Sequence, residues 1–121
     1  MPTKIDNRRE DSRSPIPGFV GAEIAFNGPD GTVHKYALTA LSVAGGSFGL
    51  AQRVPGLTEG TECDGGLIRV GELEIRVNLQ IRHVTRSEGK GYECGVRLYP
   101  LSDQDRNELT ALISRLRSVP A

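Results

Sequence analysis

The chain has 121 residues, 37% of them hydrophobic and only six aromatic (three Tyr, three Phe), so it can bury one core but not two. Fifteen basic and fifteen acidic residues give a formal net charge of zero, which argues against a general nucleic-acid-binding protein, because such proteins carry a basic excess. No apolar stretch is long enough to cross a bilayer and the first ten residues lack a secretory signal, so we expect a cytoplasmic protein without membrane insertion.

The N-terminal residues are polar, highly charged and without periodicity. We predict that residues 1–14 form a flexible arm and that residues 15–118 form a single domain. Strand-like alternation of apolar and polar residues begins near Phe19 and recurs along the chain. It predicts strands at about 20–26, 33–41, 48–52, 67–70, 73–82 and 92–99.

The period of the pattern changes after Pro100. Ser102 is a good helix N-cap, and acidic residues follow it in the first turn, where the helix dipole favours negative charge. Apolar residues then recur at helical spacing from Leu109 to Leu116, which predicts a helix at about 102–117. Short strands closed by one helix predict an all-β fold with a C-terminal helix, in which the helix covers a small antiparallel barrel.

Two short segments carry the chemistry of the sequence. Arg8, Arg9 and Arg13 lie on the arm, and each guanidinium offers a planar fork of donors that matches phosphate oxygens or the O6 and N7 atoms of guanine. About thirty residues later, Ser42 offers a hydroxyl, and Gly45 allows the backbone to approach a ligand closely. Each segment alone is more often structural, as a solvated arm or an ordinary turn.

Their order around this strand pattern resembles the PilZ domain family. Arg9-Glu10-Asp11-Ser12-Arg13 is similar to the family's Arg-x-x-x-Arg motif, and Ala40-Leu41-Ser42-Val43-Ala44-Gly45 is similar to its Asp/Asn-x-Ser-x-x-Gly motif. Residues 91–98 look like the family's last strand and residues 101–116 like its closing helix. The resemblance implies a six-stranded (split) antiparallel β-barrel and a bacterial receptor for the second messenger cyclic di-GMP.

The resemblance also implies how such a receptor works. Arg8, Arg9, Arg13, Ser42 and Gly45 are the ligand-binding residues that match the family's motifs. The arm is expected to fold onto the barrel when cyclic di-GMP binds, and the complex is expected to act on an unidentified effector protein. No catalytic residues, cofactor, metal or nucleic-acid polymer are implied, so we expect a receptor or adaptor that is not an enzyme.

Ala40 departs from the family pattern, because alanine replaces the leading Asp or Asn of the second motif. An acid or an amide accepts hydrogen bonds from a guanine edge, and alanine does not. Losing one such contact costs about 1–3 kcal/mol of binding free energy. Thr39 or Asp11 are candidate replacements.

Alternative functions rest on the same features. A PilZ-like protein-interaction adaptor that has lost the nucleotide is the first alternative. An oligonucleotide-binding barrel would need aromatic stacking residues and a basic groove, and the chain has neither in quantity. The residues His34, Cys63, His83 and Cys94 are spread over different strands, which disfavours a metal site. We expect the two thiols to be buried or half-buried and His83 to lie at the surface or to stack on a guanine.

Overall fold

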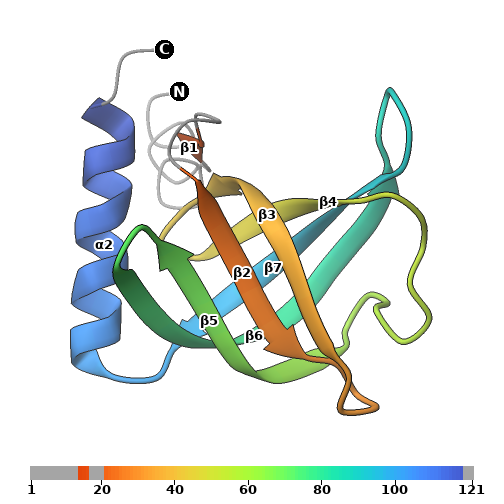
Figure 1. Ribbon diagram of the computed structural model, residues 1–121, viewed down its shortest axis with the longest axis horizontal. Coiled ribbons are helices and arrows are strands. Elements are labelled where there is room, and N and C mark those ends of the chain that lie inside the picture. Colours follow the sequence, from red (N-terminus) through yellow and green to blue (C-terminus); the bar gives the residue numbers. More distant parts are fainter. Residues whose placement is uncertain (1–13, 17–20, 119–121) are drawn as a thin grey trace, which may run out of the picture.

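The computed structural model describes residues 14–16 and 21–118 of the chain (Figure 1). It contains strands β1 (Ser14–Pro15), β2 (Ala22–Asn27), β3 (Val33–Leu41), β4 (Gly45–Leu50), β5 (Glu62–Val70), β6 (Leu73–Arg86) and β7 (Tyr92–Pro100), and helix α2 (Asp103–Ser118).

Six of these strands close a barrel. Each strand in the order β3, β2, β5, β6, β7 and β4 pairs antiparallel with the next, and β4 pairs back onto β3. The two-residue β1 adds to the end of β3, where Ser14 pairs with Leu41 and Pro15 with Ala40. The predicted six-stranded antiparallel barrel with a C-terminal helix is therefore confirmed.

The apolar residues that alternate along β6 form one side of the core. Ile75, Val77, Leu79 and Ile81 are at most 1% exposed, and the polar residues between them lie toward solvent. The same alternation on β2 buries Ala22, Ile24 and Phe26. Both cysteines are buried as free thiols, as expected.

Two strands begin earlier than predicted, and glycines explain both differences. Gly45 and Gly46, expected to break the chain, are the first residues of β4, because their backbones pair with β7 on one side and Gly46 also pairs with β3 on the other. On β5, the stretch Glu62–Gly66 lacks alternation because the pairing with β6 is irregular there, and Gly65 has a positive φ of 63°.

Helix α2 runs alongside the barrel and covers one side of it, as Figure 1 shows. Its buried stripe contains Leu109, Leu112, Ile113 and Leu116. The Ser102 hydroxyl accepts a hydrogen bond from the amide of Asp105 at 3.0 Å, which confirms the predicted N-cap. The helix contacts β6 and β7 and also the short strand β1.

The β6–β7 hairpin extends beyond the rest of the barrel and rises at the upper right of Figure 1. Its turn is closed by Ser87, whose hydroxyl donates to the carbonyls of Lys90 and Gly91 at 3.1 and 3.2 Å. Gly91 has a φ of 85°, and a Cβ at this position would collide with the Leu50 carbonyl. Only glycine therefore lets the hairpin approach the end of β4 so closely.

Candidate functional site

The loop between β3 and β4 carries the second predicted motif and is built around the Ser42 hydroxyl. Ser42 is fully buried, and its Oγ accepts hydrogen bonds from the amides of Ala44 at 3.2 Å and Gly45 at 3.0 Å. The same hydroxyl donates to the Gly45 carbonyl at 3.2 Å, and the Ser42 amide donates to that carbonyl at 2.7 Å. These bonds fix the loop in one shape, with Val43 exposed at its tip.

The structure brings Ser42 and Gly45 together, as the motif predicts, but both are buried within the loop. The Ser42 hydrogen-bonding capacity is taken up by the loop itself, so this residue positions the loop backbone. Sequence reasoning had treated the hydroxyl as a group that faces a ligand. Arg8, Arg9 and Arg13 lie outside the described residues.

Strand β1 places Ser14, the last residue of the predicted arm, beside this loop. Ser14, the residue directly after Arg13, pairs with Leu41, and Leu41 directly precedes Ser42. The Ile16 amide donates to the Thr39 carbonyl at 3.0 Å and continues the pairing. The residue that follows the Arg-x-x-x-Arg segment is therefore held at the start of the Ser-x-x-Gly segment.

Arg97 on β7 is a further cation next to the loop. Gly45 pairs with Arg97, and the Leu98 amide donates to the Ala44 carbonyl at 2.9 Å. The Arg97 side chain is exposed, and its guanidinium carbon lies 5.6 Å from the centre of the Tyr99 ring. Sequence reasoning missed Arg97, although its place at alternate positions with Glu93 and Tyr99 on the last strand predicts an outward direction.

The outer face of β4 is formed by small residues. Phe48 and Leu50 point into the core, so the residues between them and before them, Gly45, Ser47 and Gly49, share the opposite face. Thr39 on β3 lies beside this row, where its hydroxyl donates to the Ser47 carbonyl at 3.1 Å and its Oγ1 lies 3.0 Å from the Ser47 Oγ. The result is a floor with almost no side chains next to the Ser42 loop.

His83 on β6 lies against the neighbouring glycine of β7. Gly95 pairs with both Ser47 and His83, and a Cβ on Gly95 would collide with the imidazole ring of His83. The ring is half-buried, and its Nδ1 is buried without a hydrogen-bond partner among the described residues. Packing on Gly95 explains the position of the ring, and guanine stacking at this residue stays a prediction.

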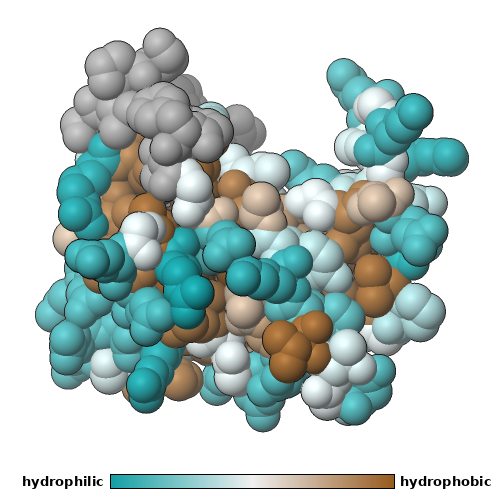
Figure 2. Space-filling view, in the orientation of Figure 1, coloured by the Kyte–Doolittle hydropathy of each residue, from teal (hydrophilic) through white to brown (hydrophobic). Residues whose placement is uncertain are grey.

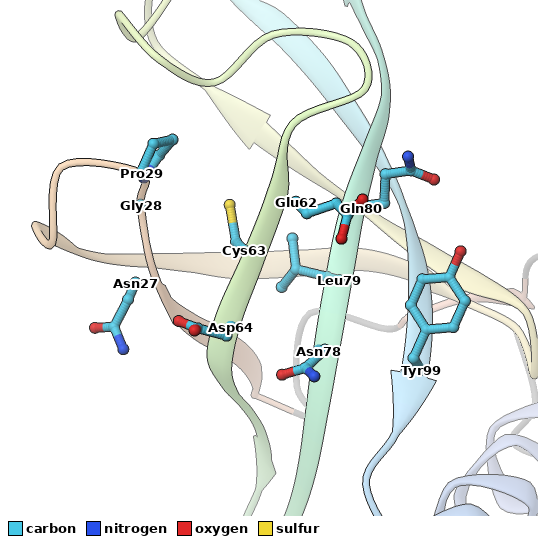
Figure 3. A pocket seen from close by; sticks show the side chains of 10 residues that line it. All are labelled: Asn27, Gly28, Pro29, Glu62, Cys63, Asp64, Asn78, Leu79, Gln80 and Tyr99. Atoms are coloured by element: carbon cyan, nitrogen blue, oxygen red, sulfur yellow. The ribbon is translucent and has the colours of Figure 1, made fainter.

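A polar cavity of about 640 Å³ lies farther around the barrel, across β2, β5, β6 and β7 (Figure 3). Polar side chains from all four strands line it, namely Asn27, Glu62, Asp64, Asn78, Gln80 and Tyr99. Burial, with a smaller contribution from the charge of Asp64, raises the pKa of the Cys63 thiol at its edge, so this cysteine is a poor nucleophile. No group of three His, Cys, Asp or Glu side chains that could hold a metal occurs in the described part of the chain.

Two exposed ion pairs are formed by residues that are not part of the Ser42 loop. Lys35 contacts Glu23 at 3.7 Å, and Arg69 contacts Glu74 at 2.8 Å. Exposed pairs of this kind contribute little to stability. Over residues 14–16 and 21–118, no helix has the length and apolar character required to cross a bilayer.

Solved structures share this fold at low sequence identity. The PilZ domain of YcgR from Escherichia coli, solved with c-di-GMP, superposes with a TM-score of 0.73 at 16% identity over 88% of both chains. MrkH from K. pneumonia gives 0.76 at 11% identity, where 89% of this chain covers 48% of that one. The Bacillus subtilis inhibitor of motility, MotI/DgrA, gives 0.70 at 12% identity over 88% of this chain and 50% of that one.

Sequence comparison identifies the family independently of the fold. No protein of curated function matches the chain in sequence. The PilZ domain profile, however, matches residues 7–115, a range that includes the Arg-x-x-x-Arg segment, the Ser42 loop, the whole barrel and most of α2. With the profile and the barrel in agreement, this chain belongs to the PilZ domain family.

Proposed function

We propose that the protein is a cyclic di-GMP receptor that signals by folding its N-terminal arm onto the barrel. The observation that carries the proposal is the pairing of Ser14 with Leu41, which joins the arm to the barrel one residue before Ser42. Membership in the PilZ domain family and the likeness to the YcgR PilZ domain, which was solved with c-di-GMP, support the same ligand.

The arm and the loop take different roles in this proposal. Arg9 and Arg13, helped by Arg8, bind the phosphates and the guanine O6 and N7 atoms through bidentate hydrogen bonds. Ser42 and Gly45 form the opposite wall, in which the Ser42 hydroxyl keeps the loop backbone in place for the ligand. Closing the arm costs conformational entropy and creates a new surface, which an effector protein then recognises.

A calorimetric titration of the folded protein with cyclic di-GMP tests the proposal. We expect saturable binding to the natural sequence, and loss of binding by at least about a hundredfold in Arg9→Ala/Arg13→Ala, because two charge-assisted contacts disappear. Arg106→Ala, which removes an exposed arginine from α2, is the matched control and should bind normally. A folded protein that takes up no ligand at high micromolar concentration would refute the receptor function.

The alanine at position 40 leads to a second prediction about binding. It lies on β3 between Pro15 and Ser47, its two pairing partners, so an acid at this position would stand beside the proposed site. We expect Ala40→Asp to tighten binding about ten- to hundredfold, because the acid restores an acceptor for guanine.

The missing acid also favours a second candidate function, a PilZ-like adaptor that works only through protein contacts. In that case the set of captured partner proteins would be the same with and without cyclic di-GMP. It would also be unchanged by Arg9→Ala/Arg13→Ala. A partner set that changes with the nucleotide would reject the adaptor in favour of the receptor.

A further inference from the structure

The small-residue face of β4 continues from the Ser42 loop toward the β6–β7 hairpin. Along it, Gly45 pairs with Arg97 and Gly49 pairs with Glu93, so one end of the face lies beside a cation and the other beside a carboxylate. The two glycines are four positions apart on an extended strand, which places them roughly 13 Å from each other. The two ends of the face therefore lie beside side chains of opposite charge.

A hollow of about 370 Å³ lies at the carboxylate end of the face. Thr39 lies on one side of it, Gly49 and Glu93 also line it, and Ser87 and Lys90 contribute from the base of the hairpin. Figure 2 shows the hydrophilic β6–β7 hairpin projecting above the rest of the surface. The volume is within the range of small-molecule sites.

The hydroxyls at the edge of this hollow are arranged as acceptors. Because the Thr39 hydroxyl donates its proton to the Ser47 carbonyl, the contact between Thr39 Oγ1 and Ser47 Oγ is completed by the Ser47 proton. Both protons are then used within the pair. Thr39 is exposed and Ser47 is 3% exposed, so the free lone pair that a ligand meets belongs to Thr39.

The charged side chains of the hollow complete a pattern that matches guanine. Glu93 and Lys90 are both exposed, and neither forms an ion pair with another described residue. The guanine edge presents N1–H and N2–H₂ donors beside the O6 acceptor. A carboxylate accepts from the two donors, and an ammonium donates to O6.

We propose that this hollow holds one guanine base of cyclic di-GMP, with Glu93 and Thr39 as the specificity-determining acceptors and Lys90 as the donor to O6. The proposal rests on the proposed receptor function and adds a base subsite that lies away from the Ser42 loop. It also explains how the chain keeps an acceptor for guanine although Ala40 has none.

Filling the hollow tests the subsite directly. A Cβ on Gly49 would meet nothing closer than the Tyr92 carbonyl at 4.0 Å, and the φ of Gly49 is not positive, so Gly49→Leu fits the fold and occupies the floor. Gly89→Leu is the matched control, because a Cβ on Gly89 at the hairpin tip meets nothing within 4 Å and lies outside the hollow. We expect at least a tenfold loss of cyclic di-GMP affinity for Gly49→Leu and none for Gly89→Leu.

A second pair of variants tests the chemistry and does not depend on the added bulk. Glu93→Gln should weaken cyclic di-GMP binding about tenfold, because a neutral amide offers one oxygen where the carboxylate offers two, whereas Glu88→Gln at the hairpin tip should leave the affinity unchanged. If the natural protein binds cyclic di-GMP and both Gly49→Leu and Glu93→Gln bind equally well, the subsite is refuted while the receptor function stands. If the natural protein binds no cyclic di-GMP, the receptor function fails and the subsite fails with it.

Discussion

At the scale of single residues, Ser42 shows how one buried hydroxyl fixes the shape of a loop. Its buried hydroxyl accepts hydrogen bonds from two amides and donates one to a carbonyl. It therefore supplies hydrogen-bond partners to backbone groups of the loop. The loop shape, and with it the backbone that borders Arg97 and strand β1, depends on this one oxygen.

Replacing Ser42 by alanine should therefore reduce the free energy of unfolding by about 1–3 kcal/mol, because the amides of Ala44 and Gly45 lose their acceptor. Urea denaturation monitored by circular dichroism measures the loss. Ser87→Ala is the comparison, since the Ser87 hydroxyl only donates, to two carbonyls in a more exposed hairpin turn. Equal losses in the two variants would contradict the role given to Ser42.

At the scale of elements, the start of α2 is joined to the barrel through Asp105. Its carboxylate accepts from the Ser102 hydroxyl at 2.7 Å and from the backbone amide of Arg76 on β6 at 2.9 Å. The Ser102 hydrogen bond, followed by that of the Arg76 amide, lowers the pKa of Asp105 below its ordinary value of 3.8. The ionised carboxylate thus holds the helix to the sheet.

Because the folded pKa of Asp105 is below the unfolded value, its contribution to stability is complete above pH 3.8 and is lost as the pH falls through the folded pKa. Asp105→Asn should cost about 1 kcal/mol at pH 7 and progressively less below pH 3.8. Urea denaturation at pH 7 and pH 3 measures both values. Asp103→Asn is the control, as Asp103 makes no side-chain hydrogen bond with the described residues, and a pH-independent cost at Asp105 would count against this account.

The elements that the sequence predicts well are those with a strong local pattern. Strand β6 and helix α2 each bury one side, so apolar residues recur every second position along β6 and at helical spacing along α2. These local patterns are sufficient to locate both elements. The start of β4 at Gly45 depends instead on backbone pairing with residues far along the chain, which a pair of glycines does not reveal. For the same reason the pattern gives no sign of strand β1.

The sequence also predicts only part of the candidate site. The motif predicts that Ser42 and Gly45 lie together, because they are close in the sequence. Arg97 and Glu93 reach the same face only through the pairing of β7 with β4, which a single sequence does not specify. The hollow beside Thr39 depends on the projecting hairpin and was not predicted.

At the scale of the whole molecule, the proposed site forms only when the strands close into a barrel. The β3–β4 pairing completes the ring of strands, and the proposed ligand face lies on those two strands and on β7. A ligand bound there favours the folded state, because the face does not exist in the unfolded chain.

Thermal unfolding should therefore respond to cyclic di-GMP. At a ligand concentration one hundred times Kd, binding adds about 2.7 kcal/mol, which corresponds to a rise in Tm of roughly 10 °C for a domain of this size. Differential scanning calorimetry measures the shift, with cyclic di-AMP at the same concentration as the control. An unchanged Tm with saturating cyclic di-GMP would contradict binding to the folded barrel.

In the proposed receptor, the short strand β1 would strengthen ligand binding by the arm. Backbone pairing at Ser14 and Pro15 acts as a tether, and Arg9 is five residues before Ser14, so an extended chain carries its Cα at most about 18 Å from the anchor. Within that radius one guanidinium group corresponds to a local concentration on the order of tens of millimolar. A separate peptide with the same arginines would have to be supplied at that concentration to bind equally well. The pairing of the two β1 residues with β3 removes this requirement, because it keeps the arginines attached to the barrel.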